Sequence, residues 1–311
     1  MAQEARIRNI AIYPIKSCAG VDVDSARLTR SGLVVGRYTD HQFMVVSNDP
    51  KFIHGNEDKQ DGVYNFVTQR DRRNRQDEGQ SLSVMALVKP EFVPEGLRLT
   101  WNYQDRILLP VKEGSILPVN VWGDVCQALD QGDDYAQWFS DHLGMPVRLV
   151  KAAGPFSRAA RQDYVANTNG VKFHDAYPVL WFPIESVDEL SQRAGQDIPW
   201  TRFRPQVVVE GMEPQYEHRI LSGEIAGIQF LNGKPCDRCP VTLVDQETGV
   251  VTGKEPLRTL NKYKRWRKPN GNVKVIFGEN MLPLEEGEIA VGSSFVATYL
   301  RDPPLVYGAE V

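Results

Sequence analysis

The chain has 311 residues, of which 41% are hydrophobic and 24% charged, and its formal net charge is −4 at pH 7. This composition is ordinary for a soluble globular protein, and the net charge gives no indication of nucleic-acid binding. No run of about 18 apolar residues exists that would span a membrane, and residues 1–6 have the features of neither a signal peptide nor a transit peptide. We therefore expect a cytoplasmic protein with one large or two smaller domains, and four free cysteine thiols.

The first part of the chain reads as β-structure only. Short segments of alternating or β-branched residues are separated by turn signals, which is typical of a barrel or a sandwich. The expected strands cover residues 7–13, 28–33, 43–46, 65–68, 82–88, 97–101 and 119–122.

Helices join the strands after residue 130. A first helix is expected from Asp134 to Gly144, capped by Asp133 or Asp134 itself. A second should begin at Ser186, where Ser186 and Glu189 have the spacing of a capping box, and should end at Gly195. Further strands are expected at residues 145–150, 206–209, 225–231, 241–244, 273–277 and 291–299. The change near residue 130 predicts the domain boundary.

The most chemically suggestive stretch contains two cysteines three positions apart, Cys236 and Cys239, with Lys234 and Arg238 beside them. A reactive thiolate needs positive neighbours and some exposure. A structural zinc site would need two more ligands at similar spacing, and a thioredoxin-like pair would lie between a strand and a helix rather than before a strand. Two buried, inert cysteines remain a third alternative.

A second candidate site lies in the loop between Pro14 and Gly20. Lys16 and Ser17 at its centre combine a cation with a hydroxyl group, which suits an oxyanion such as phosphate. The alternative is an ordinary lysine in a turn after a strand. One basic and aromatic run at residues 262–268 is too weak a signal to predict a nucleic-acid partner.

Several motifs follow one another in the order found in a known family. Residues 12–20 resemble the opening of the MOSC N-terminal β-barrel domain, and residues 65–70 resemble its T-x-R segment. The motifs that resemble the MOSC domain itself are residues 201–205, the loop from Cys236 to Cys239, residues 244–245, residues 254–260 and residues 277–280. Over residues 6–300 the chain thus resembles MOSC proteins, in particular the mitochondrial amidoxime-reducing component and bacterial proteins of the same layout.

This resemblance implies the fold and its division. The expected fold class is β-rich α/β, with a MOSC N-terminal β-barrel domain at residues 6–130. A barrel-like MOSC domain with flanking helices would follow at residues 131–300, and a cofactor would lie in the cleft between them.

The resemblance also implies roles for individual residues. Cys239 would be the molybdenum ligand, and Cys239, His41 and Asp245 would be the catalytic residues. The residues that would hold the molybdenum cofactor, a molybdopterin, are Lys16, Ser17, His41, Tyr177, Arg204, Gln206 and Arg238.

Some positions depart from the family pattern. His41 replaces an arginine, Gln206 replaces an asparagine, and Asp237 replaces a serine. Ala176 and Tyr177 replace a pair that bears hydroxyl groups. The negative charge of Asp237 is unfavourable near a bound anion unless its side chain turns away.

The implied activity is the reductive removal of oxygen from N-hydroxylated compounds such as amidoximes, hydroxylamines and N-oxides. A separate protein, cytochrome b5-like or a flavin reductase, would deliver the electrons, and no membrane span is expected. Two alternatives stay open. The protein could be a carrier of sulfur or of the molybdenum cofactor that uses Cys239. It could also be a scaffold without molybdenum that binds another small molecule or a protein.

Overall fold

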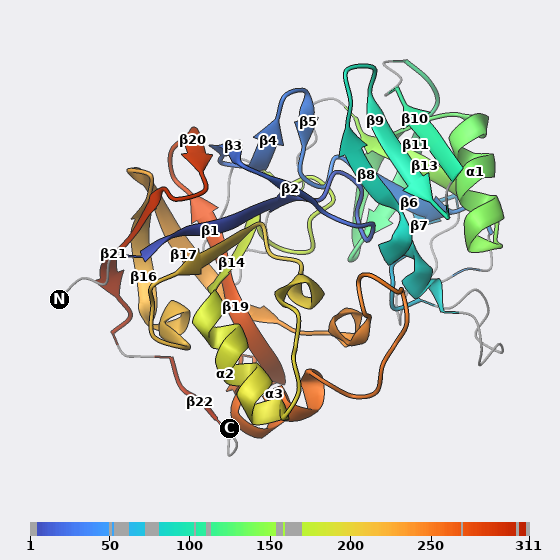
Figure 1. Cartoon of the computed structure of the whole chain (residues 1–311). Coiled ribbons are helices and arrows are strands. Elements are labelled where there is room, and N and C mark those ends of the chain that lie inside the picture. Colours follow the sequence, from blue (N-terminus) through green and yellow to red (C-terminus); the bar gives the residue numbers. More distant parts are fainter. Residues whose placement is uncertain are drawn as a thin grey trace.

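The computed structural model describes residues 5–49, 52, 62–71, 81–102, 104–109, 113–153, 158, 170–268, 270–302 and 305–308. In this part of the chain, 22 strands and three α-helices form two β-rich bodies (Figure 1). The helices are α1 (Asp133–Leu143), α2 (Ile184–Ala194) and α3 (Leu257–Tyr263). None of the described helices is both long enough and apolar enough to cross a bilayer.

The larger body is a closed barrel. Its strand order is β14-β15-β1-β21-β16-β17-β19, and the pairing of β14 with β19 closes the ring. The bounds are β14 (Val179–Pro183), β15 (Val207–Glu210), β1 (Ala5–Ile12), β21 (Ser294–Leu300), β16 (Ile220–Ile225), β17 (Ile228–Asp237) and β19 (Val273–Pro283). Outside the ring, β2 (Val21–Val23) pairs with β1, and β18 (Arg265–Arg267) and β22 (Tyr307–Gly308) extend the sheet beyond β19.

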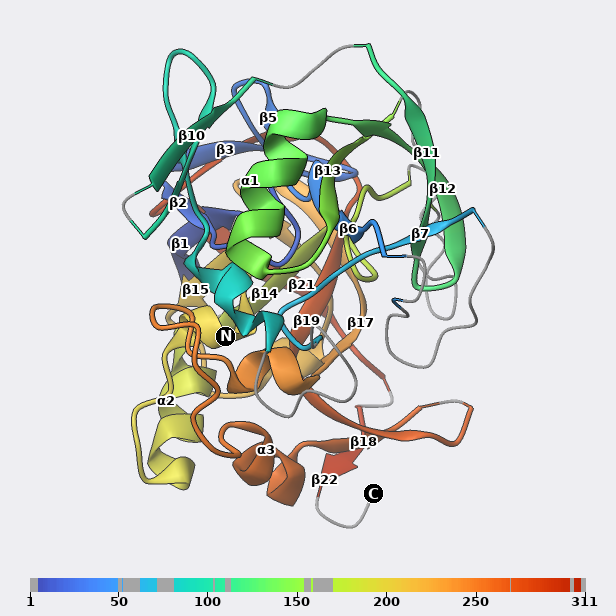
Figure 2. The same ribbon diagram turned by 90° about the vertical axis from the view of Figure 1, so that its right-hand side faces the viewer.

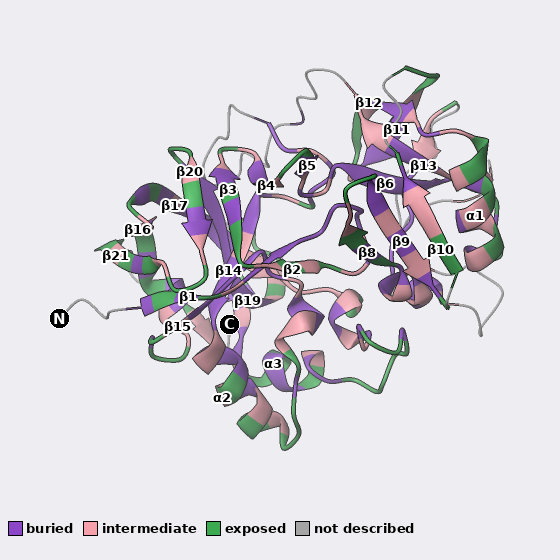
Figure 3. Ribbon diagram, turned by 45° about the horizontal axis from the view of Figure 1, so that its top comes forward, coloured by how far each residue is buried: buried purple, intermediate pink, exposed green. Residues whose placement is uncertain are grey.

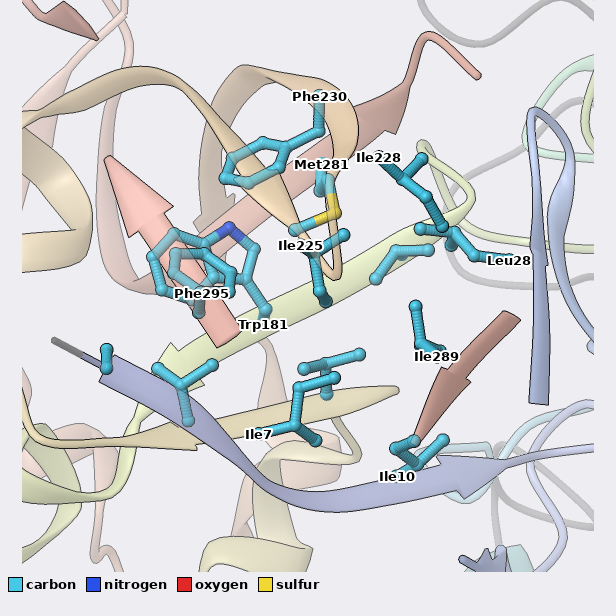
Figure 4. Packing of buried hydrophobic residues seen from close by; sticks show 14 of the residues in the cluster. Ile7, Ile10, Leu28, Trp181, Ile225, Ile228, Phe230, Met281, Ile289 and Phe295 are labelled. Atoms are coloured by element: carbon cyan, nitrogen blue, oxygen red, sulfur yellow. The ribbon is translucent and has the colours of Figure 1, made fainter. Parts of the chain in front are cut away.

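The interior of this barrel is filled by large apolar side chains from strands that are far apart in the sequence. Ile7 and Ile10 of β1 point into the same core as Trp181, Phe230 and Phe295 (Figure 4). The first half of β1 alternates buried and exposed residues, as expected for a strand with one face on a core. The N-terminal strand is therefore an integral part of a barrel that is otherwise built by the second half of the chain.

The smaller body is a five-stranded sheet of order β6-β13-β12-β11-β7, covered on one side by α1 (Figure 2). Phe139 and Leu143 of α1 pack with Val147 and Leu149 of β13 in one core. The bounds are β6 (Phe43–Ser47), β13 (Val147–Ala152), β12 (Asp124–Asp130), β11 (Ile116–Val121) and β7 (Tyr64–Asn65).

Two smaller sheets complete the described fold. The three-stranded sheet contains β8 (Lys89–Phe92), β9 (Leu97–Trp101) and β10 (Gln104–Leu108). The four-stranded sheet contains β20 (Gly287–Ala290), β3 (Ser25–Thr29), β4 (Gly32–Val35) and β5 (Tyr38–Thr39). Buried residues follow the barrel strands, while exposed residues gather along α2, on the outer side of α1 and on β10 (Figure 3).

The predicted β-rich fold with two barrel-like parts and flanking helices is confirmed. The division at residue 130 stays a prediction. In the structure β13, which follows that boundary, pairs with β6 and β12, whereas β1, which precedes it, lies in the larger barrel.

Five of the expected strands differ from the structure. The expected strand at 65–68 is reduced to β7 and an isolated bridge at Phe66, and the one at 225–231 contains the turn between β16 and β17. Residues 82–88 form a 3-10 helix (Leu82–Leu87), because the side chain of Ser81 accepts the backbone N–H of Ser83 and caps it. The expected strand at 241–244 is a 3-10 helix (Pro240–Leu243) that begins with a proline, which has no N–H for a strand ladder. The expected strand at 28–33 is a hairpin of β3 and β4.

Both predicted helices exist, but their N-terminal caps differ. The N-cap of α1 is Gly132, with φ of 97°, and neither aspartate caps the helix. Ser186 lies inside α2, and its hydroxyl donates to Glu217 over 3.0 Å instead of closing a capping box. Gly195 ends α2 as expected, in the left-handed region that glycine adopts readily. The helix α3 was not predicted.

Replacing Trp181 by alanine tests the barrel core. Its ring is fully buried 4.4 Å from that of Phe295, and its indole N–H donates to Asn232 over 2.9 Å. Trp181→Ala should lower the free energy of unfolding by about 3–5 kcal/mol, because it leaves a cavity. Urea unfolding measures this, with Leu221→Ala at an exposed position of β16 as the control, expected to cost less than about 0.5 kcal/mol. Equal losses in both variants would contradict the assigned core.

Candidate functional site

A cavity of about 410 Å³ is lined by residues from both bodies. Of the nine residues predicted for the site, eight lie in its wall: Lys16, Ser17, His41, Tyr177, Arg204, Gln206, Arg238 and Cys239. These residues are up to 223 positions apart in the sequence, since 239 − 16 = 223. The fold thus brings together both candidate motifs, the loop of Lys16 and the loop of Cys239.

Asp245, the ninth residue, does not line this cavity. Its Oδ1 accepts the backbone N–H groups of Glu247 over 3.0 Å and Thr248 over 2.9 Å, which closes a turn. Its Oδ2 lies 3.7 Å from Arg202. The structure therefore gives Asp245 a role in holding a turn, at a distance from the groups around Cys239.

Lys16 is held in a fixed position by the segment that leads from β1 to β6. Its backbone N–H donates to Phe43 over 2.9 Å, and the next residue, Ser17, has a left-handed backbone with φ of 69°. The ammonium group of Lys16 is 3% exposed, donates to the carbonyl of Phe173 over 2.8 Å and forms an ion pair with Asp175. Burial lowers the pKa of Lys16, and the carboxylate of Asp175 opposes that shift.

The Cys239 loop begins where the pairing of β17 with β19 becomes irregular. Cys239 is half-buried and precedes Pro240, which starts a 3-10 helix. Burial raises the pKa of the Cys239 thiol; Asp175 adds to the shift, while Arg70 and Arg238 oppose it. In the free protein this side chain is therefore a thiol, and binding a metal would displace its proton.

Cys236 lines the same cavity and is also half-buried. Burial raises the pKa of its thiol as well, although Arg238 and Lys234 oppose the shift. In the absence of a bound ligand, therefore, neither cysteine is a reactive thiolate.

The two predicted arginines differ in what their side chains already bind. The guanidinium of Arg238 donates to the backbone carbonyls of Phe277 and Phe203, so it fixes the Cys239 loop against the barrel. Arg204 lies over the ring of Tyr13 at 4.4 Å and donates from Nη1 to Gln246 over 3.1 Å. Its Nη2 is buried and has no hydrogen-bond partner. Arg204 therefore has an unused donor for a bound anion.

Asp40 is the buried centre of a polar cluster at the cavity wall. Its Oδ2 lies 2.7 Å from His41 Nδ1, 3.0 Å from His174 Nε2 and 3.0 Å from Gln206 Nε2. Its Oδ1 accepts the N–H of Tyr13 over 2.6 Å. Burial alone would raise the pKa of Asp40, but the charge of His41 and the hydrogen bonds from His41 and His174 hold it well below its usual range.

The carboxylate of Asp40 fixes the tautomer of His41. Because Nδ1–H donates to Asp40, Nε2 is the nitrogen that can hold or release a proton. Asp40, His41 and His174 also have ligand atoms within 4.8 Å of one another, a spacing compatible with a small metal site. The hydrogen bonds to Asp40 account for the positions of these groups without a metal.

Gln206 and Tyr177 shape the wall. The amide of Gln206 donates to Asp40 and accepts the backbone N–H of Leu180 over 2.7 Å, so both of its ends are used inside the protein. The ring of Tyr177 packs on Gly233, where an added Cβ would lie 2.3 Å from a ring carbon. Only glycine allows this close approach.

Two side chains of the cavity wall, one acidic and one aromatic, were not predicted from the sequence. Asp175 pairs with Lys16 and accepts the indole N–H of Trp122 over 2.9 Å, and both Asp175 and Trp122 line the cavity. The sequence offered one indication of Asp175, which is that it lies two positions before the predicted site residue Tyr177. Asp237 also lines the cavity, and its charge is offset in part because its Oδ2 pairs with Lys268 and lies 3.7 Å from Lys234.

Two family models match the sequence. The MOSC N-terminal beta barrel domain matches residues 4–146, and the MOSC domain matches residues 168–296. The chain belongs to the MOSC-domain proteins. The two matched ranges contain the two cavity loops, those of Lys16 and Cys239.

Curated relatives match over most of the chain. The mitochondrial amidoxime-reducing component 1 of Homo sapiens is 29% identical over 304 residues, which covers 94% of this chain and 82% of that protein. The mitochondrial amidoxime reducing component 2 of Bos taurus is 28% identical over 271 residues, 85% of this chain and 74% of that protein. These relatives carry the word mitochondrial in their names, and the cytoplasmic location of this MOSC protein stays a prediction.

The buried His174 predicts how stability depends on pH. Burial lowers its pKa to about 4, whereas an unfolded histidine has a pKa of about 6.5. Below pH 6.5 the unfolded chain therefore binds a proton that the folded chain does not, so stability falls as the pH falls toward 4. Between pH 7.5 and pH 5, this residue should cost about 2 kcal/mol in the free energy of unfolding.

Denaturant unfolding at the two pH values measures this difference. When the pH is lowered from 7.5 to 5, the free energy of unfolding of His174→Gln should fall by about 2 kcal/mol less than that of the parent protein. His142→Gln, which removes a histidine from α1, serves as the control and should keep the full loss. An unchanged pH dependence in His174→Gln would contradict the assignment.

Proposed function

We propose that this MOSC protein binds a molybdenum cofactor in the cavity and reductively removes oxygen from N-hydroxylated compounds. The observation that carries the proposal is the joint presence of Cys239, Lys16 and the unused donor of Arg204 in one cavity. The names of the relatives, which describe the reduction of amidoximes, support the same reaction class.

The cavity has the properties that such a cofactor needs. A volume of about 410 Å³ falls in the range of small-molecule and cofactor sites. The buried Nη2 of Arg204 suits a phosphate oxygen, and Lys16 adds a second cation. Cys239 offers the soft sulfur ligand that a metal already bound to sulfur accepts.

When bound, the cofactor would supply the two-electron and oxygen-atom chemistry that no side chain of the protein can perform. The overall reaction converts an N–OH group, two electrons and two protons into N–H and water. The electrons would come from a separate donor protein, such as a cytochrome b5-like protein or a flavin reductase.

The side chains have three tasks in this proposal. Cys239 anchors the metal, and Arg238 holds the loop of Cys239 in place through the carbonyls of Phe203 and Phe277. Lys16 and Arg204 bind the anionic part of the cofactor. His41, oriented by Asp40, holds a proton at Nε2 for transfer toward the departing oxygen.

A scaffold without molybdenum is the second candidate. The ion pair of Lys16 with Asp175 and the contacts of Arg238 with backbone carbonyls favour it, because these cations already have partners in the free protein. About one molybdenum per chain in purified protein would rule this candidate out, and its absence after expression in a host that makes the cofactor would support it.

Exchanging the two cysteines separately tests the ligand assignment. Cys239→Ser should abolish the reduction of benzamidoxime, because the metal loses its sulfur ligand from the protein. Cys236→Ser should retain most of the activity. Reduction is measured with a chemical electron donor, and circular dichroism checks the fold of both variants. Equal losses would indicate that the two cysteines act as a pair.

Removing the guanidinium of Arg204 tests the anion site. Arg204→Met should weaken cofactor binding by about tenfold or more, because a charge-assisted hydrogen bond to a buried anion is lost. Molybdenum analysis and pterin fluorescence after oxidation measure the content per chain. Arg193→Met on α2, where the arginine pairs with Glu189 at the surface, is the control and should keep full content. Full content in Arg204→Met would place the anion elsewhere.

A further inference from the structure

An unusual backbone conformation occurs at the edge of the cavity. The strands β11 and β12 are joined by a two-residue turn, since Val121 pairs with Asp124. Trp122 has φ of 57° and Gly123 has φ of 92°. A turn with two positive φ values normally has Asn-Gly or a similar pair, and a bulky residue such as tryptophan is disfavoured at its first position. Local backbone preference therefore does not explain this tryptophan.

The surrounding structure holds the indole of Trp122 in one orientation. Its Nε1–H donates to Asp175 over 2.9 Å, and its ring meets Phe66 edge to face at 5.1 Å. The guanidinium of Arg70 lies over the ring at 4.6 Å. Strained residues that are fixed by several neighbours occur preferentially at functional sites.

The same indole is part of the wall that contains the proposed metal ligand. Trp122, Arg70, Asp175 and Cys239 all line the one cavity. Trp122 is half-buried, and Asp175 connects it to Lys16. The guanidinium of Arg70 lies over the indole and both groups line this wall, so they offer π-systems there, whereas Lys16 and Arg204 supply the charge for an anion.

We propose that Trp122, with Arg70 on its ring, determines specificity by binding the flat, conjugated part of an N-hydroxylated substrate. This inference rests on the proposed function. A planar ring gains stacking energy on such a surface, and an aliphatic substrate of similar polarity gains much less. In this proposal the strained turn serves recognition of the substrate.

Binding measured in the absence of an electron donor tests this role separately from catalysis. Benzamidoxime and acetamidoxime, which differ in their aromatic ring, are titrated calorimetrically into the cofactor-loaded parent protein, Trp122→Asn and Trp122→Phe. Trp122→Asn creates the Asn-Gly pair that the turn prefers, so the hairpin is expected to stay folded. Trp138→Phe on α1, outside the cavity wall, is the control.

In Trp122→Asn we expect the dissociation constant of benzamidoxime to rise by about tenfold and that of acetamidoxime to stay within about twofold. Trp122→Phe should keep most of the affinity for benzamidoxime, because it retains a ring. Equal weakening of both ligands, unchanged binding of benzamidoxime, or no binding of either ligand by the parent would overturn the proposal. A lower molybdenum content in Trp122→Asn would overturn it as well, because the ring would then serve the cofactor.

The reductase activity and the recognition surface at Trp122 can fail independently of each other. A parent protein that binds benzamidoxime selectively through Trp122 but does not reduce it would disprove the reductase and leave the recognition surface standing. A parent that reduces both compounds with the same preference as Trp122→Asn would disprove only the recognition surface.

Discussion

The pairing of β1 with β15 and β21 is the constraint on which the site depends. It places the first strand of the chain in the barrel formed by the second half, with Ile7 and Ile10 in the common core. The connection from β1 to β2 then runs beside β6, where the backbone N–H of Lys16 donates to Phe43. Lys16 consequently lies in the same cavity as Cys239, although neither loop could hold the other in place by local structure.

Some of the charges around the cavity are already paired before any ligand binds. Asp175 neutralises Lys16, and Asp237 is paired with Lys268 and lies close to Lys234. The histidines and the amide of Gln206 surround Asp40. Two arginines of the cavity wall, Arg204 and Arg202, each have one buried nitrogen atom that lacks a hydrogen-bond partner. An anionic ligand would therefore find donors in the wall that no group of the protein already uses.

Eight of the nine residues predicted from sequence motifs line one cavity, and several of them lie in two short loops. Cys239 and Arg238 share one such loop, and Lys16 and Ser17 share another. Asp175 and Trp122 escaped detection because their importance arises from contacts across the fold, which no local pattern encodes. Asp245 lies outside the cavity wall, and the sequence alone could not show this, because an aspartate that closes a turn looks the same in the sequence as one that transfers protons. Strand periodicity predicted a β-rich fold, and the resemblance to MOSC proteins implied the barrels. The segments Leu82–Leu87 and Pro240–Leu243 are 3-10 helices instead of strands because of a serine cap and a proline.

The position of β1 also has a consequence for the order in which the chain is made. Its neighbours β15 and β21 begin about 200 and 290 residues later. Nearly the whole chain must therefore be synthesised before β1 can pair with β21 and the barrel can close. Until then the apolar side of β1 has no permanent cover, which makes the nascent protein a candidate for chaperone protection and places barrel closure among the last steps of its maturation.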